Sequence, residues 1–398
     1  MNPWIVTLTL SLLAGSFAAL AQGGDPPAPA EDHEYYGTLT FDDGQQFTGG
    51  PGIDLGQMIY MDALGTQELF KLQRTGEDTM SSGGSAPQVE WSRDDQGRLV
   101  AAEFEYGDGR KRTARFEGTR SEPIEIENEG DRILGRLHLP AGDGPHPAIV
   151  LIHGSGDCSS RWGTFVSFFV DLGMAVVAYD KRGVGVSEGD WREGSYDVLA
   201  EDAARFVDAL GDRSDIDRTR IGLMGHSEGG WVAPITAAKR AHVAFVLVRV
   251  GPAVSFPDVV QYQNHDLVSM RGRSARELAA WDRLYEIVTN GIRNSEPYET
   301  MQENLEPLRT QGWLPGWDPS GNLLSQFQRE WEFYLRNANH KPAEVLSTLR
   351  APVLWFLGEA DLNVETASTV AVLDKSLAQH PDATDSSAEP LFPRAATH

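Results

Sequence analysis

The chain reads TRIGLMGHSEGGWVAPITAAKRA over residues 219–241, and the rest of the sequence is best interpreted from this stretch. It begins with a short apolar run that is typical of a buried strand and ends with apolar side chains at helical spacing. Between them, GHSEG at residues 225–229 fits the pattern G-x-S-x-G, in which a sharp turn between strand and helix exposes a serine. Gly225 and Gly229 stand where a side chain would collide as strand and helix cross. We therefore predict that Ser227 is a nucleophile.

A second stretch, GVSEG at residues 185–189, matches the same pattern. It is followed by DWREGS at residues 190–195, a polar segment containing glycine that starts no helix at the required point. Since a reactive serine of this kind needs a helix directly after the turn, we interpret Ser187 as a loop residue.

From about residue 123 onward, short apolar runs alternate with helical patterns. This alternation predicts an α/β fold with a mostly parallel sheet covered by helices on both faces, over residues 123–398. The expected strands are residues 133–139, 148–153, 175–180, 220–224, 243–250 and 353–357, and the expected helices are residues 162–172, 198–210 and 231–240.

Residues 255–349 are longer than a connection between two neighbouring strands needs to be, which predicts an inserted helical domain. Helical patterns are clearest at residues 277–287 and 326–335. The aromatic side chains of the insert either form its own core or line a lid over an apolar binding pocket, and both interpretations stay open. They are Trp281, Trp313, Trp317, Trp331, Phe333 and Tyr334.

Residues 33–120 contain short alternating segments separated by Asp-Gly and Gly-Gly turns, which predicts a small antiparallel β domain. The clearest hairpin turns at Asp108-Gly109. One face of this hairpin is expected to hold Val100, Ala102, Phe104 and Tyr106, with Arg112, Ala114 and Phe116 on the returning strand.

The first residues are typical of a secretory signal. Residues 5–20 are apolar and uncharged, and Ala19-Leu20-Ala21 fits the small-x-small rule for cleavage. The apolar segment is short for a permanent membrane anchor. We therefore expect a signal peptide over residues 1–21, cleaved after Ala21, then a Pro/Ala/Asp-rich spacer over residues 22–32, and export to the periplasm or the exterior.

The formal net charge of -24 argues against nucleic acids and anionic membranes as partners, because both would be repelled. The single cysteine, Cys158, excludes an internal disulfide framework. Histidines without ligand spacing and the lack of a nucleotide fingerprint predict no metal and no cofactor. A small molecule is the expected partner, while the oligomeric state is left open.

Residues 153–156 read HGSG and follow an apolar strand. Glycines let the backbone approach a bound carbonyl, so the N–H groups of Ser155 and Glu228 are expected to form the oxyanion hole. His153 is either a catalytic base or a residue that pins the loop, and a histidine at a strand end favours the second interpretation.

Asp361 follows the expected strand at residues 353–357 and lies beyond its carboxyl end, where sites in open α/β sheets collect. It is the candidate acid, with Glu359 as the alternative. In this architecture the histidine follows the acid, which leaves His380 and His398. His380 precedes a proline at what reads as a helix end, so His398 is the favoured base.

Four segments together resemble the α/β-hydrolase superfamily, and within it secreted esterases and acyl hydrolases related to dienelactone hydrolase and to the serine-aminopeptidase branch. The resemblance implies that Ser227 is the nucleophile and Asp361 the acid, and that Ser187 lies in a structural loop. The family's histidine commonly follows a Phe-Pro-Gly-type turn, to which FPRAATH at residues 392–398 is similar. The four segments are HGSG at 153–156, YDKRGVGVS at 179–187, GHSEGG at 225–230 and GEAD at 358–361.

Three functions follow from these residues. The first is a secreted serine hydrolase that cleaves carboxylic esters through an acyl-enzyme, in which Ser227 attacks, His398 relays the proton and Asp361 orients the imidazole. The second is a peptidase or acyl-peptide hydrolase, because the same triad cleaves amides. The third is a non-catalytic binding protein of the same fold, if His398 is not in place.

Overall fold

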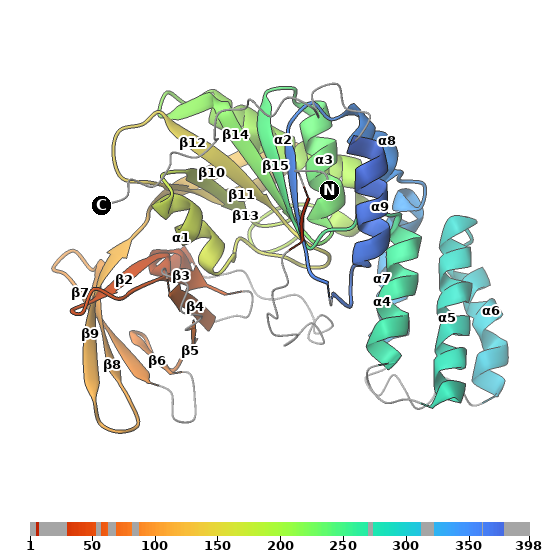
Figure 1. Ribbon diagram of the computed structural model, residues 1–398, viewed down its shortest axis with the longest axis horizontal. Coiled ribbons are helices and arrows are strands. Elements are labelled where there is room, and N and C mark those ends of the chain that lie inside the picture. The colour runs from red at the N-terminus through yellow and green to blue at the C-terminus, as the bar shows by residue number, and fades with distance from the viewer. Residues whose placement is uncertain are drawn as a thin grey trace.

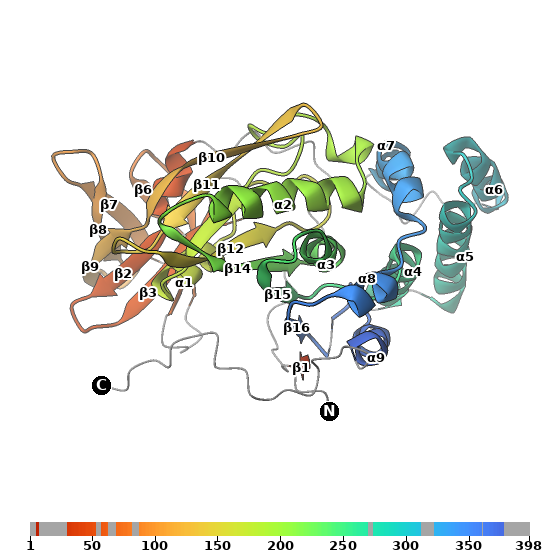
Figure 2. The ribbon, with the colours of Figure 1, turned by 90° about the horizontal axis from the view of Figure 1, so that it is seen from above.

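The computed structural model describes residues 5–7, 30–52, 57–62, 69–81, 87–269, 274–311, 322–359 and 361–377. The chain forms a closed β barrel, a larger α/β domain and a group of helices inserted into that domain (Figure 1). The barrel and the inserted helices lie at opposite ends of the molecule, with the α/β domain between them (Figures 1 and 2).

The amino-terminal barrel is antiparallel and closed, because β2 pairs with both β3 and β9. It follows a short 3-10 helix, η1 (Ala30–Tyr35), and its interior is filled mostly by aromatic and aliphatic side chains. The antiparallel β domain expected from the sequence is therefore confirmed. Its strands are β2 (Gly37–Phe41), β3 (Gln46–Pro51), β4 (Gln57–Asp62), β5 (Leu69–Arg74), β6 (Thr79–Ser81), β7 (Gln88–Arg93), β8 (Leu99–Glu105) and β9 (Lys111–Gly118).

The hairpin of β8 and β9 is present, but the prediction that Val100 shares a face with Ala102 and Phe104 is wrong. The pairing of β7 with β8 shifts between Ser92 and Arg93, so that Val100 is an extra residue in its strand. Such a bulge reverses the alternation of faces at that point. Val100 is therefore 37% exposed, and its neighbour Leu99 is buried in its place.

The α/β domain is built on an eight-stranded sheet of order β1-β16-β15-β14-β12-β13-β11-β10. Neighbouring strands are parallel from β1 to β13, whereas β11 is antiparallel to both β13 and β10. All six predicted strands are present. The strands are β10 (Arg120–Asn128), β11 (Asp131–Leu139), β12 (His146–Ile152), β13 (Ala175–Tyr179), β14 (Ile216–His226), β15 (Val243–Arg249), β16 (Val353–Leu357) and β1 (Ile5–Thr7).

Two strands of this sheet were not expected from the sequence. β10 contains Pro123, which a strand tolerates at the edge of a sheet, and among the described strands β10 pairs with β11 alone. β1 comes from the segment predicted to be a signal peptide and pairs with β16. Cleavage after Ala21 would therefore remove β1 from the edge of the sheet.

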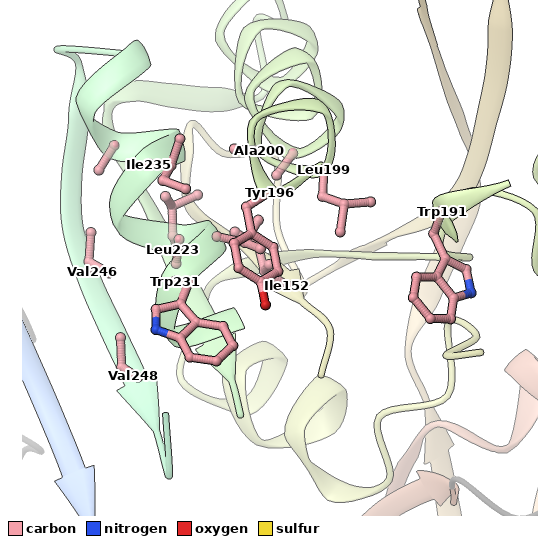
Figure 3. Packing of buried hydrophobic residues seen from close by; sticks show 14 of the residues in the cluster. Ile152, Trp191, Tyr196, Leu199, Ala200, Leu223, Trp231, Ile235, Val246 and Val248 are labelled. Atoms are coloured by element: carbon pink, nitrogen blue, oxygen red, sulfur yellow. The ribbon is translucent and has the colours of Figure 1, made fainter. Parts of the chain in front are cut away.

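Helices cover both faces of the sheet. On one face, α2 and α3 pack on alternate residues of β12, where Ala148, Val150 and Ile152 point towards them. On the other face, α1 packs with Ile149 and Leu151. Figure 3 shows the first face, where the ring of Trp231 on α3 lies beside that of Tyr196 on α2. The three helices are α1 (Thr164–Asp171), α2 (Tyr196–Gly211) and α3 (Gly229–Lys239), and a further helix, α9 (Thr366–Leu377), follows β16.

The insert between β15 and β16 is helical, as predicted. Its described aromatic side chains pack into the main core: Phe333 contacts Trp191 and Tyr196 of the α/β domain, and Tyr334 stacks on Phe256. Trp313 and Trp317 lie outside the described residues. The helices are α4 (Phe256–Ser269), α5 (Ala275–Arg293), α6 (Tyr298–Thr310), α7 (Asn322–Asn337) and α8 (Pro342–Thr348).

Candidate active site

Ser227 lies on a strained turn between β14 and α3. Its φ angle is 51°, a left-handed conformation that is costly for a residue with a side chain. A Cβ atom on Gly225 would lie 2.1 Å from the carbonyl oxygen of Gly229, and one on Gly229 would lie 2.6 Å from that of Ile152. The two glycines are therefore required by the crossing of strand and helix, as the sequence predicted.

The second motif forms a supporting loop. The hydroxyl of Ser187 donates to the carbonyl oxygen of Asp180 at 2.8 Å and accepts from the N–H of Leu134 at 2.9 Å. The carboxylate of Asp180 accepts from the N–H groups of Ser160 and Val186. Ser187 thus ties its own loop to β11 and to the end of β13, which agrees with its interpretation as a loop residue.

The loop after β12 lies directly beside Ser227. A Cβ atom on Gly154 would lie 3.4 Å from Cβ of Ser227, so the backbone of this loop passes within contact distance of the reactive side chain. Ser155 is exposed, whereas Glu228 is buried. Ser155 and Glu228, which are expected to supply the oxyanion N–H groups, therefore lie on either side of the contact between this loop and the turn at Ser227.

His153 is buried at the start of this loop, and one nitrogen of its ring lies 2.6 Å from the carbonyl oxygen of Tyr179. Burial lowers the pKa of His153 to about 3, and burial likewise lowers the pKa of His226, next to the nucleophile, to about 3. An imidazole with such a pKa is a poor proton acceptor at neutral pH. The geometry therefore favours a structural role for His153, whose ring attaches the start of the loop to the end of β13.

Asp361 lies four residues beyond the end of β16. Its carboxylate oxygen Oδ1 accepts the N–H groups of Asn363 at 2.8 Å and Val364 at 3.0 Å, and its carbonyl oxygen accepts the hydroxyl of Tyr262 at 3.0 Å. Both of these backbone N–H groups bind Oδ1 of the carboxylate. Asp361 is intermediate in exposure, whereas the alternative acid, Glu359, is exposed. Only β15 separates β16 from β14, so Asp361 and Ser227 follow the carboxyl ends of strands about 10 Å apart.

Arg249 was not singled out by the sequence, because it reads as an ordinary strand end. It ends β15 in register with His226, and its Nη1 lies 3.0 Å from Nδ1 of that histidine. Its carbonyl oxygen accepts the N–H of Ser227 at 3.0 Å. Desolvation lowers the pKa of Arg249, and the nearby carboxylate of Asp361 opposes that shift. A guanidinium therefore ends the strand that lies between the strands preceding Ser227 and Asp361.

The two candidate bases, His380 and His398, lie outside the described residues. Among the described residues no three His, Cys, Asp or Glu side chains are grouped so as to hold a metal ion. In the same part of the chain, no helix combines the length and the apolar character that a membrane span requires.

The parallel sheet and the serine at its strand–turn–helix junction place the protein in the class of α/β hydrolases. More particularly, the family model of the serine aminopeptidases, S33, matches residues 143–385. This match covers more than half of the chain, which therefore belongs to that family. The predicted resemblance to the α/β-hydrolase superfamily and its serine-aminopeptidase branch is confirmed.

Several known proteins are similar to parts of the chain. Monoglyceride lipase of Homo sapiens is 31% identical over 133 residues, which are 33% of this chain and 43% of the lipase. Esterase EstD of Thermotoga maritima is 30% identical over 145 residues, or 34% of each chain. An uncharacterised 31.7 kDa protein of the traX-finO intergenic region of Escherichia coli is 33% identical over 231 residues, covering 56% of this chain and 76% of that protein. The chain thus spans less than half the length of the lipase and of the esterase.

Two solved structures are also similar. An esterase of Pyrococcus furiosus is 17% identical with a TM-score of 0.44, covering 66% of this chain and 79% of the esterase. A puromycin-hydrolyzing peptidase of Mycobacterium tuberculosis is 17% identical with a TM-score of 0.43, covering 86% of this chain and 48% of the peptidase. The family assignment rests on the family match and not on these two likenesses.

Proposed function

We propose that the protein is a serine hydrolase that cleaves carboxylic esters through an acyl-enzyme. The observation that carries this proposal is the left-handed turn at Ser227, which places the serine against Gly154 of the neighbouring loop. A strained non-glycine residue persists where the surrounding structure holds it for a function. The similarity to a lipase and an esterase favours an ester as the substrate.

In the proposed reaction, Oγ of Ser227 attacks the ester carbonyl carbon while the imidazole of His398 takes the hydroxyl proton. The N–H groups of Ser155 and Glu228 bind the oxyanion that forms. The C–O bond to the alcohol then breaks, and the imidazolium returns the proton to the leaving alcohol. Water, which gives a proton to the same imidazole, then attacks the carbonyl carbon of the acyl-enzyme. The bond between that carbon and Oγ of Ser227 breaks, the imidazolium returns the proton to Oγ, and the carboxylic acid is released. Asp361 holds the imidazole in its orientation throughout.

The proposal predicts that Ser227→Ala abolishes hydrolysis of short p-nitrophenyl esters. Loss of a triad serine typically costs on the order of 10⁶ in turnover. Ser187→Ala is the matched control, because it removes the same hydroxyl from the other G-x-S-x-G motif. Turnover by Ser227→Ala at the rate of the unaltered protein would overturn the assignment of the nucleophile.

The base is tested by a second matched pair, His398→Ala and His380→Ala. Both residues follow the acid in the chain, so either satisfies the order of the triad. The proposal predicts loss of turnover in His398→Ala alone. Loss in His380→Ala alone would transfer the role of base to that residue, and full activity of both variants would mean that the base is a different residue. No turnover by the unaltered protein would favour the binding protein that lacks a base.

The name of the family favours one second candidate, a peptidase acting on amino-terminal residues. The triad is the same, and only the substrate pocket distinguishes amide from ester cleavage. Turnover of aminoacyl-naphthylamides above that of matched esters would favour the peptidase.

The inserted helices have a proposed role as a lid. The insert contacts Asp361 through Tyr262. A groove of about 360 Å³ lies between α4 and the start of α9, lined by Val259, Glu365 and Ser368 among others.

Export is the proposed location of the protein, with cleavage after Ala21. The mass of the protein recovered from the periplasm of an expressing host tests that site of cleavage.

A further inference from the structure

We propose that Lys181 is a positioning residue that orients both backbone N–H donors of the oxyanion hole. The inference rests on the proposed function of Ser227 as the nucleophile. Lys181 belongs to the YDKRGVGVS segment, which also contains Ser187 of the second G-x-S-x-G motif. None of the roles described so far uses the side chain of Lys181.

The first donor is oriented through its own peptide group. Nζ of Lys181 donates to the carbonyl oxygen of Gly154 at 3.1 Å, and the N–H of the same peptide unit belongs to Ser155. A trans peptide is planar, so its C=O and N–H bonds point in opposite directions. Because the buried ammonium draws the carbonyl inward, the N–H of Ser155 is turned outward, towards the exposed side of the loop.

The second donor is held by the same ammonium. Nζ of Lys181 lies 2.8 Å from Oε1 of Glu228, and the two side chains are 4% and 3% exposed. Glu228 directly follows Ser227, and its N–H is the other proposed oxyanion donor. The ammonium of Lys181 therefore connects the loop after β12 to the turn at Ser227, at the point where Gly154 and Ser227 come into contact.

The ammonium is itself held in place. The ring of Trp191 lies under it, with Nζ 4.5 Å from the ring centroid, and the backbone N–H of Lys181 donates to the carbonyl oxygen of Cys158 at 3.0 Å. Nε1 of Trp191 donates to Asp157 at 2.7 Å. Cys158 and Asp157 both belong to the loop after β12, so the position of Lys181 and the path of that loop are set together.

A charged donor on the carbonyl of Gly154 also strengthens the N–H of that peptide as a donor, because hydrogen bonds in a chain polarise one another. An ion pair kept for stability alone would behave differently. Buried pairs are often replaced by apolar residues of similar volume without loss of stability. The two roles therefore predict different outcomes when both charges are removed together.

The experiment compares Lys181→Met with the double variant Lys181→Met/Glu228→Met, which leaves no unpaired charge. We expect both to lose roughly 10- to 100-fold in kcat/KM on p-nitrophenyl esters, somewhat less than the loss of a whole oxyanion donor. The loss should fall on kcat, with KM little changed. The inhibition constant of a trifluoromethyl ketone, which mimics the tetrahedral intermediate, should weaken by a similar factor.

The matched control is Arg182→Met/Asp202→Met, which removes the buried pair formed by the next residue of the same segment. The hydrogen bonds of this pair join α2 to Asn128 and Asp131 at the ends of β10 and β11, whereas those of Lys181 go to Gly154 and Glu228. We therefore expect kcat to be retained even if the thermal midpoint falls. Unchanged kcat and inhibitor affinity in a folded Lys181→Met/Glu228→Met protein would overturn the inference. If the unaltered protein hydrolyses no ester and Ser227 accepts no fluorophosphonate, the proposed function fails first, and the inference fails with it.

Discussion

At the scale of single residues, the proposed nucleophile Ser227 has a strained backbone conformation. The left-handed conformation costs a residue with a side chain roughly 1–2 kcal/mol, and glycine adopts it freely. The conformation is held by the hydrogen bond from the N–H of Ser227 to the carbonyl oxygen of Arg249, and by the close crossing of strand and helix at Gly225 and Gly229. The serine is therefore expected to reduce the stability of the fold while it supplies the chemistry.

This strain predicts that Ser227→Gly raises the free energy of unfolding by about 0.5–1 kcal/mol, after allowance for the greater flexibility of glycine in the unfolded chain. Ser187→Gly is the matched control. It should be destabilising, because it removes a hydroxyl that makes two short hydrogen bonds to the backbone. Urea unfolding of both variants provides the comparison. Equal destabilisation of the two would show that Ser227 carries no strain.

At the scale of elements, the barrel is attached to the loop after β12, which carries Ser155, one of the two proposed oxyanion donors. The hydroxyl of Tyr36 accepts the N–H of Trp162 at 2.9 Å, and the N–H of Gly163 donates to the carbonyl oxygen of Pro51 at 2.7 Å. These contacts fix the end of the loop after β12 just before α1 begins. The barrel thus supports an element of the candidate site.

We predict that Tyr36→Phe destabilises the protein by about 1–3 kcal/mol, because it leaves the buried N–H of Trp162 without its partner. Amide hydrogen exchange at Trp162 should become faster. Tyr60→Phe is the matched control, since it removes a buried hydroxyl that donates to the carbonyl oxygen of Tyr35 inside the barrel. Faster exchange at Trp162 in both variants would mean that the hydrogen bond with Tyr36 does not specifically stabilise the loop.

The elements that the sequence predicted are those in which one local signal dominates. The apolar runs of β12 to β16 and the glycines around Ser227 were interpreted correctly, because burial and steric collision act within a few residues. Val100 was misplaced because a bulge depends on pairing with another strand. Lys181 and Arg249 were missed because their roles come from partners distant in the chain.

At the scale of the whole molecule, the barrel and the α/β domain meet through buried polar groups. Asp32 forms buried contacts with Arg161 and lies 3.0 Å from Arg74, and Nε2 of His33 lies 3.1 Å from Oγ of Ser160. Asp32 was assigned to the spacer from sequence, yet it is 2% exposed. The interface between the two parts therefore begins earlier in the chain than its composition indicated.

Burial lowers the pKa of His33 to about 3, with a further contribution from Arg136. In the unfolded chain the pKa of histidine is about 6.5. Below pH 6.5 the unfolded chain therefore binds a proton that the folded protein does not bind until about pH 3. This contribution to stability is complete above pH 6.5 and is lost as the pH falls towards 3, at about 1.4 kcal/mol per pH unit.

We therefore predict that the free energy of unfolding falls between pH 7 and pH 4, and that His33→Gln makes this fall shallower. Urea unfolding across that range measures both slopes. A variant as steep as the unaltered protein would mean that His33 is already protonated in the folded state.

The most direct measurement is the site of covalent labelling by a fluorophosphonate, which reacts only with a serine activated by a base and an oxyanion hole. Peptide mass spectrometry of the labelled protein distinguishes the peptide with residues 225–229 from the one with residues 185–189. We predict a single adduct on Ser227, absent from Ser227→Ala and retained in Ser187→Ala. An adduct on Ser187, or no adduct on a folded and unaltered protein, would contradict the assignment of Ser227 as the nucleophile.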